Sequence, residues 1–177
     1  MVKIVQKEDP VLRHMANEVP VEEIKSAKIK TVLKNMKEAL YSQDDGIAIA
    51  APQIGQSLRI FMVSGKVLAT LEGKEDGHEE DLTFINPRIM RISKESKETD
   101  EGCLSVRYLY GKVKRAVKAS VTAYDEDGVE FKRDGHGLLA QVFQHEIDHL
   151  NGILFTDKAK DIEEVLPEHP TITPSHE

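Results

Sequence analysis

Apolar side chains recur at helical spacing along residues 21–41, while lysine and glutamate occupy many of the remaining positions. An apolar stripe with this period is typical of a helix that packs one face on a core. We therefore predict an amphipathic helix over residues 21–41, ended by the turn-forming residues Asp44, Asp45 and Gly46. The apolar positions of this helix are Ile24, Ile29, Val32, Leu33, Met36 and Leu40.

The middle of the chain consists of short apolar runs between turn-forming residues, which is the pattern of β-strands. The acidic stretch 72–81 is predicted to be an exposed hairpin tip or loop. Residues 46–55 are too rich in glycine and alanine for an ordinary core segment. Strands are predicted at residues 58–63, 67–71, 83–86, 88–93, 112–124 and 129–133.

A second helix is predicted over residues 137–150, ending at Asn151 and Gly152, which tolerate a left-handed conformation. After Lys160 the pattern thins. The expected fold class is α+β, with mainly antiparallel β-sheets packed around the 137–150 helix and an N-terminal amphipathic helix. We expect a single domain over residues 1–160 and a short C-terminal tail over residues 161–177.

The composition fits one folded domain, since the 177 residues are 40% hydrophobic and 31% charged. A net charge of −7 argues against nucleic acid binding, and the basic stretch 112–118 fits the solvated face of a strand. The sequence has no apolar leader and no run near the ~18 residues of a membrane span. With a single cysteine no intrachain disulfide is possible, so we expect a cytoplasmic protein without membrane contact.

The clearest chemical pattern is H-E-x-x-H at residues 145–149, within the second predicted helix. His145 and His149 are about 40° apart around a helix, so both imidazoles can bind one metal ion. Glu146 lies about 100° away, where it can reach a metal-bound water without being a ligand. The pattern therefore predicts a metal-dependent hydrolase with Glu146 as acid and base.

The helical positions of these polar residues place them on faces of the helix that are otherwise apolar and expected to face the core. Leu138 and Val142 share a line with His145 and His149, whereas Glu146 shares the next line with other apolar residues. Burying unpaired polar groups costs several kcal/mol, which favours a functional role. The alternative is two satisfied core histidines beside a glutamate that reaches solvent.

A third protein ligand is needed, and the sequence offers two directions for it. Zinc proteases with H-E-x-x-H place it downstream, where the candidates Glu163, Glu164, Glu168 and His169 lie in the thin C-terminal pattern. Upstream, the only cysteine, Cys103, stands in the sequence EGCLS. Two histidines and one thiolate would leave a fourth position open for water, as catalytic sites require.

Three motifs resemble those of peptide deformylases in order and spacing: GIAIAAPQ at 46–53, EGCLS at 101–105 and HEIDH at 145–149. The resemblance extends over about residues 4–158. It implies a deformylase-type catalytic domain that removes the N-formyl group from the N-terminal methionine of new polypeptides and releases formate. Nascent N-formylmethionyl polypeptides, near the ribosome exit, would be its partners.

The resemblance also implies a role for each site residue. Cys103, His145 and His149 would hold one divalent metal ion, Fe²⁺ in the cell, with Zn²⁺, Ni²⁺ or Co²⁺ possible in purified protein. The backbone N–H of Leu104 and the side-chain amide of Gln53 would stabilise charge on the formyl oxygen. The expected substrate-binding residues are Gly46, Ile47 and Ala48 in the small-residue loop and Leu138 and Val142 on the ligand stripe.

Two positions depart from the family pattern beside the expected cleft. Ala48 stands where glycine is usual, so either a positive φ is lost or a methyl group narrows the cleft. Arg107 stands where proline is usual, which would leave the loop freer and add a cation near the substrate. The rivals left open are an H-E-x-x-H metallopeptidase and a catalytically weak homologue that serves as a binding module.

Overall fold

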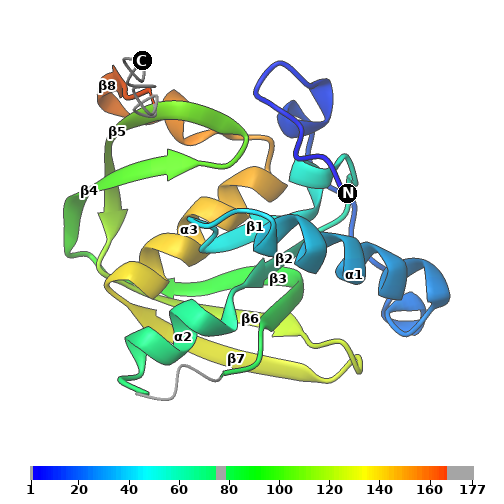
Figure 1. The fold of residues 1–177 in the computed structure, drawn as a ribbon. Coiled ribbons are helices and arrows are strands. Elements are labelled where there is room, and N and C mark those ends of the chain that lie inside the picture. Colours follow the sequence, from blue (N-terminus) through cyan, green and yellow to red (C-terminus); the bar gives the residue numbers. More distant parts are fainter. Residues whose placement is uncertain (1, 75–78, 167–177) are drawn as a thin grey trace, which may run out of the picture.

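The computed structural model describes residues 2–74 and 79–166 and places one helix, α3 (Leu138–Leu150), between two antiparallel sheets (Figure 1). The five-stranded sheet has the order β1-β2-β3-β6-β7 and the three-stranded sheet the order β4-β5-β8. This arrangement confirms the α+β class and the central position of the 137–150 helix. The strands of the larger sheet are β1 (Ala48–Ala50), β2 (Ile60–Val63), β3 (Leu82–Ile92), β6 (Lys118–Tyr124) and β7 (Glu130–His136).

The smaller sheet covers the opposite side of α3 (Figure 1). Its strands are β4 (Ser96–Cys103), β5 (Val106–Ala116) and β8 (Lys160–Glu164). Short 3-10 turns connect the elements at Pro10–Arg13, Val21–Glu23, Ala51–Ile54 and Phe155–Asp157. No helix within residues 2–74 and 79–166 has the length and apolar character needed to span a membrane.

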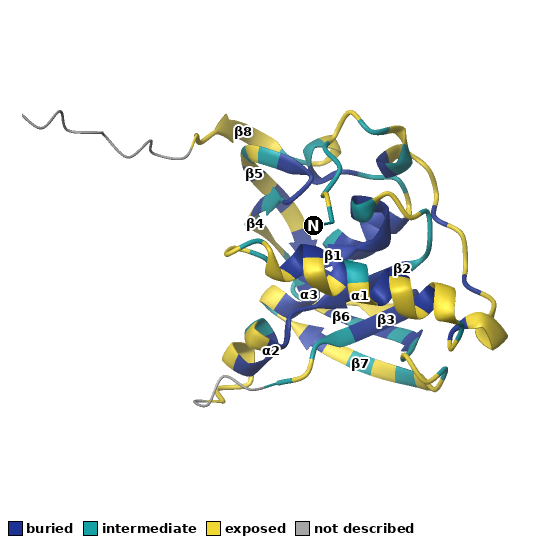
Figure 2. Cartoon of the chain, turned by 45° about the vertical axis from the view of Figure 1, so that its right-hand side comes forward, coloured by how far each residue is buried: buried dark blue, intermediate teal, exposed yellow. Residues whose placement is uncertain are grey.

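Burial of aromatic rings fixes α3 on the larger sheet. Phe143 of α3 contacts Phe84 of β3 edge-on at a ring-centroid distance of 5.2 Å, and Phe84 stacks on Phe61 at 4.4 Å. Gly135 of β7 lies directly against Phe143, where an added Cβ would come within 2.8 Å of the ring. Buried residues are concentrated around α3, and β8 is exposed along its length (Figure 2).

The N-terminal helix, α1 (Ala27–Tyr41), begins later than the pattern predicted. Ser26 caps it by accepting a hydrogen bond from the backbone N–H of Ile29, and residues Val21–Glu23 form a separate 3-10 turn. The apolar face of α1 is buried as expected, against Ile49, Ile60 and Met62 of the first two strands among others. At the end of α3, Gly152 adopts a φ of 74° whereas Asn151 does not become left-handed.

The strand predicted at residues 67–71 is wrong, because this segment belongs to the helix α2 (Gly65–Leu71). Its buried residues Gly65, Leu68 and Ala69 are three to four positions apart, which is the spacing of one helix face. This spacing outweighs the preference of valine and threonine in the segment for β-strands. In the acidic stretch 72–81 that follows, Glu72 accepts a hydrogen bond from Arg133. Residues 75–78 of that stretch lie outside the described residues.

The strands predicted at 83–86 and 88–93 form one strand, β3, which bends at Asn86 and Pro87. Asn86 has a φ of 52°, and its side chain forms hydrogen bonds with both backbone groups of Val19. Conversely, the strand predicted at 112–124 is divided at Val117 between β5 and β6, which lie in different sheets. The strand predicted at 129–133 is β7, which continues to His136.

Two further strands have too few apolar residues to be predicted. The sequence of β4 is SKETDEGC, and that of β8 is KDIEE. Both pair with β5, which supplies the apolar face of this sheet. The tail expected from residue 161 onward thus begins with a paired strand, whereas residues 167–177, including Glu168 and His169, lie outside the described residues.

Candidate metal centre

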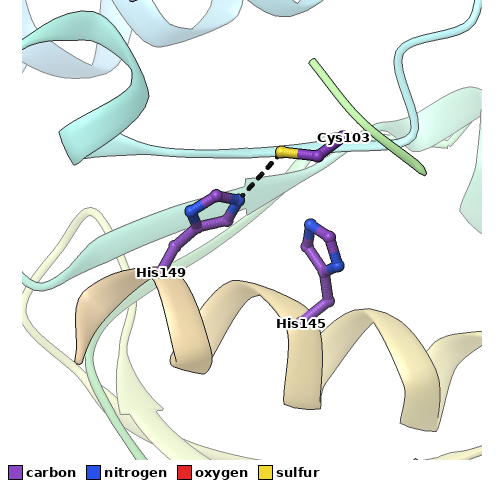
Figure 3. A group of neighbouring side chains, drawn as sticks. All are labelled: Cys103, His145 and His149. Carbon is purple, nitrogen blue, oxygen red and sulfur yellow. Dashed lines mark hydrogen bonds between the residues drawn. The ribbon is translucent and has the colours of Figure 1, made fainter. Parts of the chain in front are cut away.

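Cys103, His145 and His149 meet at the interface between α3 and the smaller sheet (Figure 3). Both imidazoles point from neighbouring turns of α3 toward Cys103, the last residue of β4 (Figure 3). The ligand atoms of the three residues lie within 4.8 Å of one another, and Cys103 Sγ is 3.2 Å from His149 Nε2. A thiolate with two imidazole nitrogens is a donor set suited to divalent transition metals, so these residues fit such an ion.

The surroundings of Cys103 favour its thiolate form. Burial by itself would raise the pKa of the Cys103 thiol, but the positive charge of His149 and hydrogen bonds from both histidines lower it to about 5. Burial would likewise lower the pKa of His145, but hydrogen bonds to Cys103 and Glu101 raise it well above its usual value. Because the thiolate is the metal-binding form of cysteine, the polypeptide prepares the ligand for an ion.

A chain of charged residues, buried except at Lys158, holds His145 in place. His145 Nδ1 is 3.0 Å from Glu101 Oε2, and Arg115 donates to both Glu101 oxygens at 2.6 and 2.9 Å. Arg115 also donates to Asp148 at 2.6 Å, and Lys158 completes the chain at 2.7 Å from Asp148. Such bonds to the far nitrogen of a metal-binding histidine fix its ring orientation and tautomer.

Arg115 corrects the expectation that the basic stretch 112–118 is only a solvated face. Lys112 and Lys114 are exposed, but Arg115 is 3% exposed. In β5, Arg115 shares the inward parity of the buried Val113, so alternation along the strand was the signal for it. A buried arginine requires acidic partners, which Glu101 and Asp148 of the two ligand motifs provide.

Glu146 is buried beside the ligand trio without a fixed partner. It is 4% exposed, and its Oε2 has no hydrogen-bond partner among the described residues. Burial raises the pKa of its carboxyl group above the usual value, although the charges of His145 and His149 oppose the shift. A buried carboxylate with a free oxygen and a raised pKa is suited to accept and return a proton.

Gln53 approaches the same point from the small-residue loop. Its Oε1 accepts a hydrogen bond from Ala50 N at 2.8 Å, which turns Nε2 toward Ser105 Oγ at 3.2 Å and Cys103 Sγ at 3.5 Å. Leu104 follows Cys103 and is held from behind, since its carbonyl accepts from Gln6 Nε2 at 3.1 Å. The structure therefore brings the predicted amide donor next to the predicted ligand.

An open cleft of about 330 Å³ connects these groups to solvent. Ala48 lies in β1 with Val63 as its partner and is not among the described residues with positive φ. Of the two effects considered for this alanine, the structure therefore supports the methyl group in the cleft. Among the predicted residues, the lining includes Ile47, Ala48, Gln53, Cys103, Leu104, Leu138, Val142, His145 and Glu146, but not Gly46 or His149.

Gly102, Tyr110 and Asp45 also line the cleft and were not predicted, whereas Arg107 was expected beside it. Gly102 leaves room for the ring of Tyr110, which an added Cβ would approach to 2.7 Å. Arg107 is not free, because it forms an ion pair with Asp45 across the cleft, at 2.7 Å. Only the departure of residue 107 from the family pattern pointed to this contact, and nothing in the sequence indicated its partner.

Comparison with known proteins agrees with this geometry. The family model described as polypeptide deformylase matches residues 1–165. The chain is 42% identical over 160 residues to a peptide deformylase of Carboxydothermus hydrogenoformans, covering 90% of this chain and 94% of the relative. It is 45% identical over 151 residues to one of Halothermothrix orenii, covering 85% and 88%. The crystal structure of a Synechococcus elongatus peptide deformylase in complex with actinonin matches with a TM-score of 0.80 at 33% identity, covering 90% of this chain and 81% of that one.

Proposed function

The chain belongs to the polypeptide deformylase family, and we propose that the cleft around Cys103, His145 and His149 is where it carries out the reaction of that family. A peptide deformylase is a hydrolase that removes the N-formyl group from the N-terminal formylmethionine of nascent polypeptides and releases formate. The observation that carries the assignment is the meeting of Cys103 with both histidines beside Gln53 and the buried Glu146.

Cys103, His145 and His149 would hold one divalent metal ion. When bound, such an ion would lower the pKa of a coordinated water and polarise the formyl carbonyl group. The soft thiolate and the two imidazoles are compatible with Fe²⁺, which we propose for the cell, and with Zn²⁺, Ni²⁺ or Co²⁺ in purified protein. Glu101 and Arg115 would keep His145 in its ligating orientation.

Glu146 would act as the general base and then as the general acid. Its unpartnered Oε2 would accept a proton from the attacking water and return it to the nitrogen of the leaving amine. The pKa raised by burial supports both halves of this role, because it strengthens the carboxylate as a base and favours its protonated form relative to an exposed glutamate. The products are formate and a polypeptide with a free N-terminal amine.

Gln53 and the backbone N–H of Leu104 would stabilise the charge that develops on the formyl oxygen. The amide of Gln53 is fixed by Ala50, so its Nε2 needs no rearrangement to donate. The methionine side chain would lie against Ile47, Leu138 and Val142, all of which line the cleft. The peptide backbone would run beside Gly46–Ala48, because β1 is the edge strand of its sheet and can accept a further strand.

We further propose that residues 1–160 form the catalytic domain and that residues 161–177, although the first of them pair with β5 in β8, take no part in catalysis. The protein would act in the cytoplasm on nascent chains near the ribosome exit. The net charge of −7 is the reason to expect no direct contact with nucleic acid.

The deciding experiment is formate release from formyl-Met-Ala-Ser by anaerobically prepared, metal-analysed protein. Glu146→Gln should lower kcat by about 10²-fold or more while metal content stays unchanged, because the variant keeps the ligands and removes the base. Glu98→Gln, at an exposed position of β4, is the control and should match the wild type. If wild-type protein with a full complement of metal releases no more formate than Glu146→Gln, the proposed activity is contradicted. The hypothesis of a catalytically weak homologue that serves as a binding module would then be favoured.

The metallopeptidase rival makes a different claim about the ligands, namely a third ligand downstream of α3. Glu163 and Glu164 lie in the exposed strand β8 and are not part of the described ligand group. Cys103→Ala should therefore lose most of the bound metal. Full retention of metal by this variant would contradict the assigned ligand set.

A further inference from the structure

Arg107 joins the two walls of the cleft through its guanidinium group. Its Nη1 is 2.7 Å from Asp45 Oδ2, and its Nη2 is 3.2 Å from Asp45 Oδ1. Nη2 also donates to Gln43 Oε1. Arg107 is the second residue of β5 and follows the turn at residues 104–105 that comes after Cys103, whereas Asp45 lies just ahead of β1. Each wall of the cleft therefore contributes one charged side chain to a bidentate ion pair.

The backbone on the Arg107 side is held in place independently of the ion pair. Gln6 accepts from the backbone N–H of Arg107 at 3.5 Å and donates to the carbonyl of Leu104 at 3.1 Å. In the described part of the opposite wall, the backbone N–H groups of Gln43 and Gly46 donate to Leu40 and Gln43, and the first backbone bond to the sheet is the one that Ile47 accepts from Ser64 at 2.9 Å. Within the described residues, the hydrogen bonds that join Gln43 and Asp45 to the beginning of β5 are all donated by Arg107.

We propose that Arg107 and Asp45 form a clasp that fixes the width of the cleft mouth and thereby sets the affinity for the peptide part of the substrate. This inference rests on the proposed function and assigns both residues a positioning role. Arg107 is partly shielded, with 27% of its side chain exposed, whereas 61% of the Asp45 side chain is exposed. The hydrogen bond from Arg107 lowers the pKa of Asp45, so the pair is charged at neutral pH.

A direct role of Arg107 as a receptor for acidic substrate side chains is less compatible with these contacts. Both terminal nitrogens already donate to Asp45 and Gln43, so a substrate carboxylate would have to displace two internal acceptors. The two roles differ in what Asp45 does. In a clasp Asp45 is needed for binding, whereas in a receptor it competes with the substrate.

The test is a double-mutant cycle with Arg107→Ala, Asp45→Ala and the double variant, assayed by formate release from formyl-Met-Ala-Ser. Each single variant should raise KM about fivefold with kcat within about twofold, because a partly exposed ion pair contributes modestly and touches no reacting atom. The double variant should be no worse than either single one. The exchanged pair, Asp45→Arg with Arg107→Asp, should recover at least half of the lost affinity.

The control is Arg13→Ala, which removes an arginine from a comparable ion pair outside the cleft. Arg13 is 2.5 Å from Asp157, with side chains 45% and 39% exposed, and this variant should leave KM unchanged. An unchanged KM in Arg107→Ala, or a double variant with the product of the single effects, would overturn the clasp. So would a KM increase confined to substrates with an acidic second residue, compared through formyl-Met-Asp-Ser and formyl-Met-Lys-Ser.

Amide hydrogen exchange separates this inference from the proposed function. If the wild type releases no formate, the proposed function fails, yet the clasp still predicts faster exchange at residues 43–47 in Arg107→Ala than in the wild type. The segment around Gln6 should be unaffected, because its bonds to Leu104 do not depend on the guanidinium group. Equal exchange at residues 43–47 in both proteins would overturn the clasp whatever the activity.

Discussion

Glu101 links the imidazole of His145, a candidate metal ligand, to the buried Arg115. Burial alone would raise the pKa of its carboxyl group, but hydrogen bonds from Arg115 and His145 lower it to about 2. The carboxylate is thus strongly favoured in the folded state, in which it bridges β4, β5 and α3. Its charge contributes to the stability of the fold as well as to the orientation of the ligand.

The pKa of Glu101 predicts how stability depends on pH. Because the folded pKa lies below the unfolded value of about 4.5, its contribution is present above pH 4.5 and is lost as the pH falls toward 2. We expect Glu101→Gln to lower the free energy of unfolding by about 3 kcal/mol at neutral pH, and by much less near pH 2. Urea unfolding of the metal-free protein between pH 2 and 7 measures this difference. A constant difference across that range would contradict the prediction.

Individual residues of the site differ in how far the sequence could predict them. The approach of His145 to His149 was predictable from their helical spacing, whereas the approach of Cys103 to both was expected from the resemblance of EGCLS to the family motif. The fixed amide of Gln53 and the pairing of Arg115 with Glu101 and Asp148 could only be suspected, because they depend on contacts between distant elements. The ion pair of Arg107 with Asp45 could not be predicted, since several acidic residues were equally available in the sequence.

At the scale of elements, close packing of α3 on β7 depends on a residue without a side chain. Gly135 places backbone where a Cβ would come within 2.8 Å of Phe143 and 3.1 Å of Leu139. Both neighbours are buried, so neither ring nor branched side chain can move away without disturbing the core. The helix that carries the ligands therefore has a closely defined distance from the larger sheet.

We expect Gly135→Ala to lower the free energy of unfolding by about 1–3 kcal/mol through overpacking. The matched control is Gly102→Ala, whose added Cβ would meet the ring of Tyr110 at 2.7 Å. Tyr110 is 43% exposed and can turn outward, so the control should be less destabilising. Thermal unfolding of both metal-free variants provides the comparison. Equal destabilisation would show that exposure of the neighbour does not decide the effect.

Elements in which apolar residues recur with a clear periodicity were the most predictable from the sequence. The 137–150 helix has a clear apolar stripe and a glycine at its end, and it matches α3 nearly to the residue. Residues 67–71 are too few for the period to separate helix from strand. The strands β4 and β8 could not be predicted, because pairing with β5 stabilises them rather than their own apolar content.

For the whole molecule, metal binding should be measurable as added stability. An ion that binds only the folded state at a thousand times its Kd contributes about 4 kcal/mol, which raises Tm by about 8–16 °C for a chain of this size. Calorimetry of protein before and after chelation should show this shift. Cys103→Ala should lose most of it, whereas Arg13→Ala should retain it. A full metal-dependent shift in Cys103→Ala would place the ion elsewhere.

The division of the ligands between β4 and α3 also has a consequence for the order of folding. Cys103 and His149 are 46 positions apart and belong to opposite sides of the interface between the smaller sheet and the helix. Bringing them together requires closing a long loop, and the entropy of that closure is recovered only after the sheet has docked. A partly folded chain would therefore contain both histidines and the thiol, but these groups would not yet lie close enough together to bind one metal ion. Metal uptake would report the last docking step, and it would distinguish finished molecules from collapsed intermediates that already contain α3.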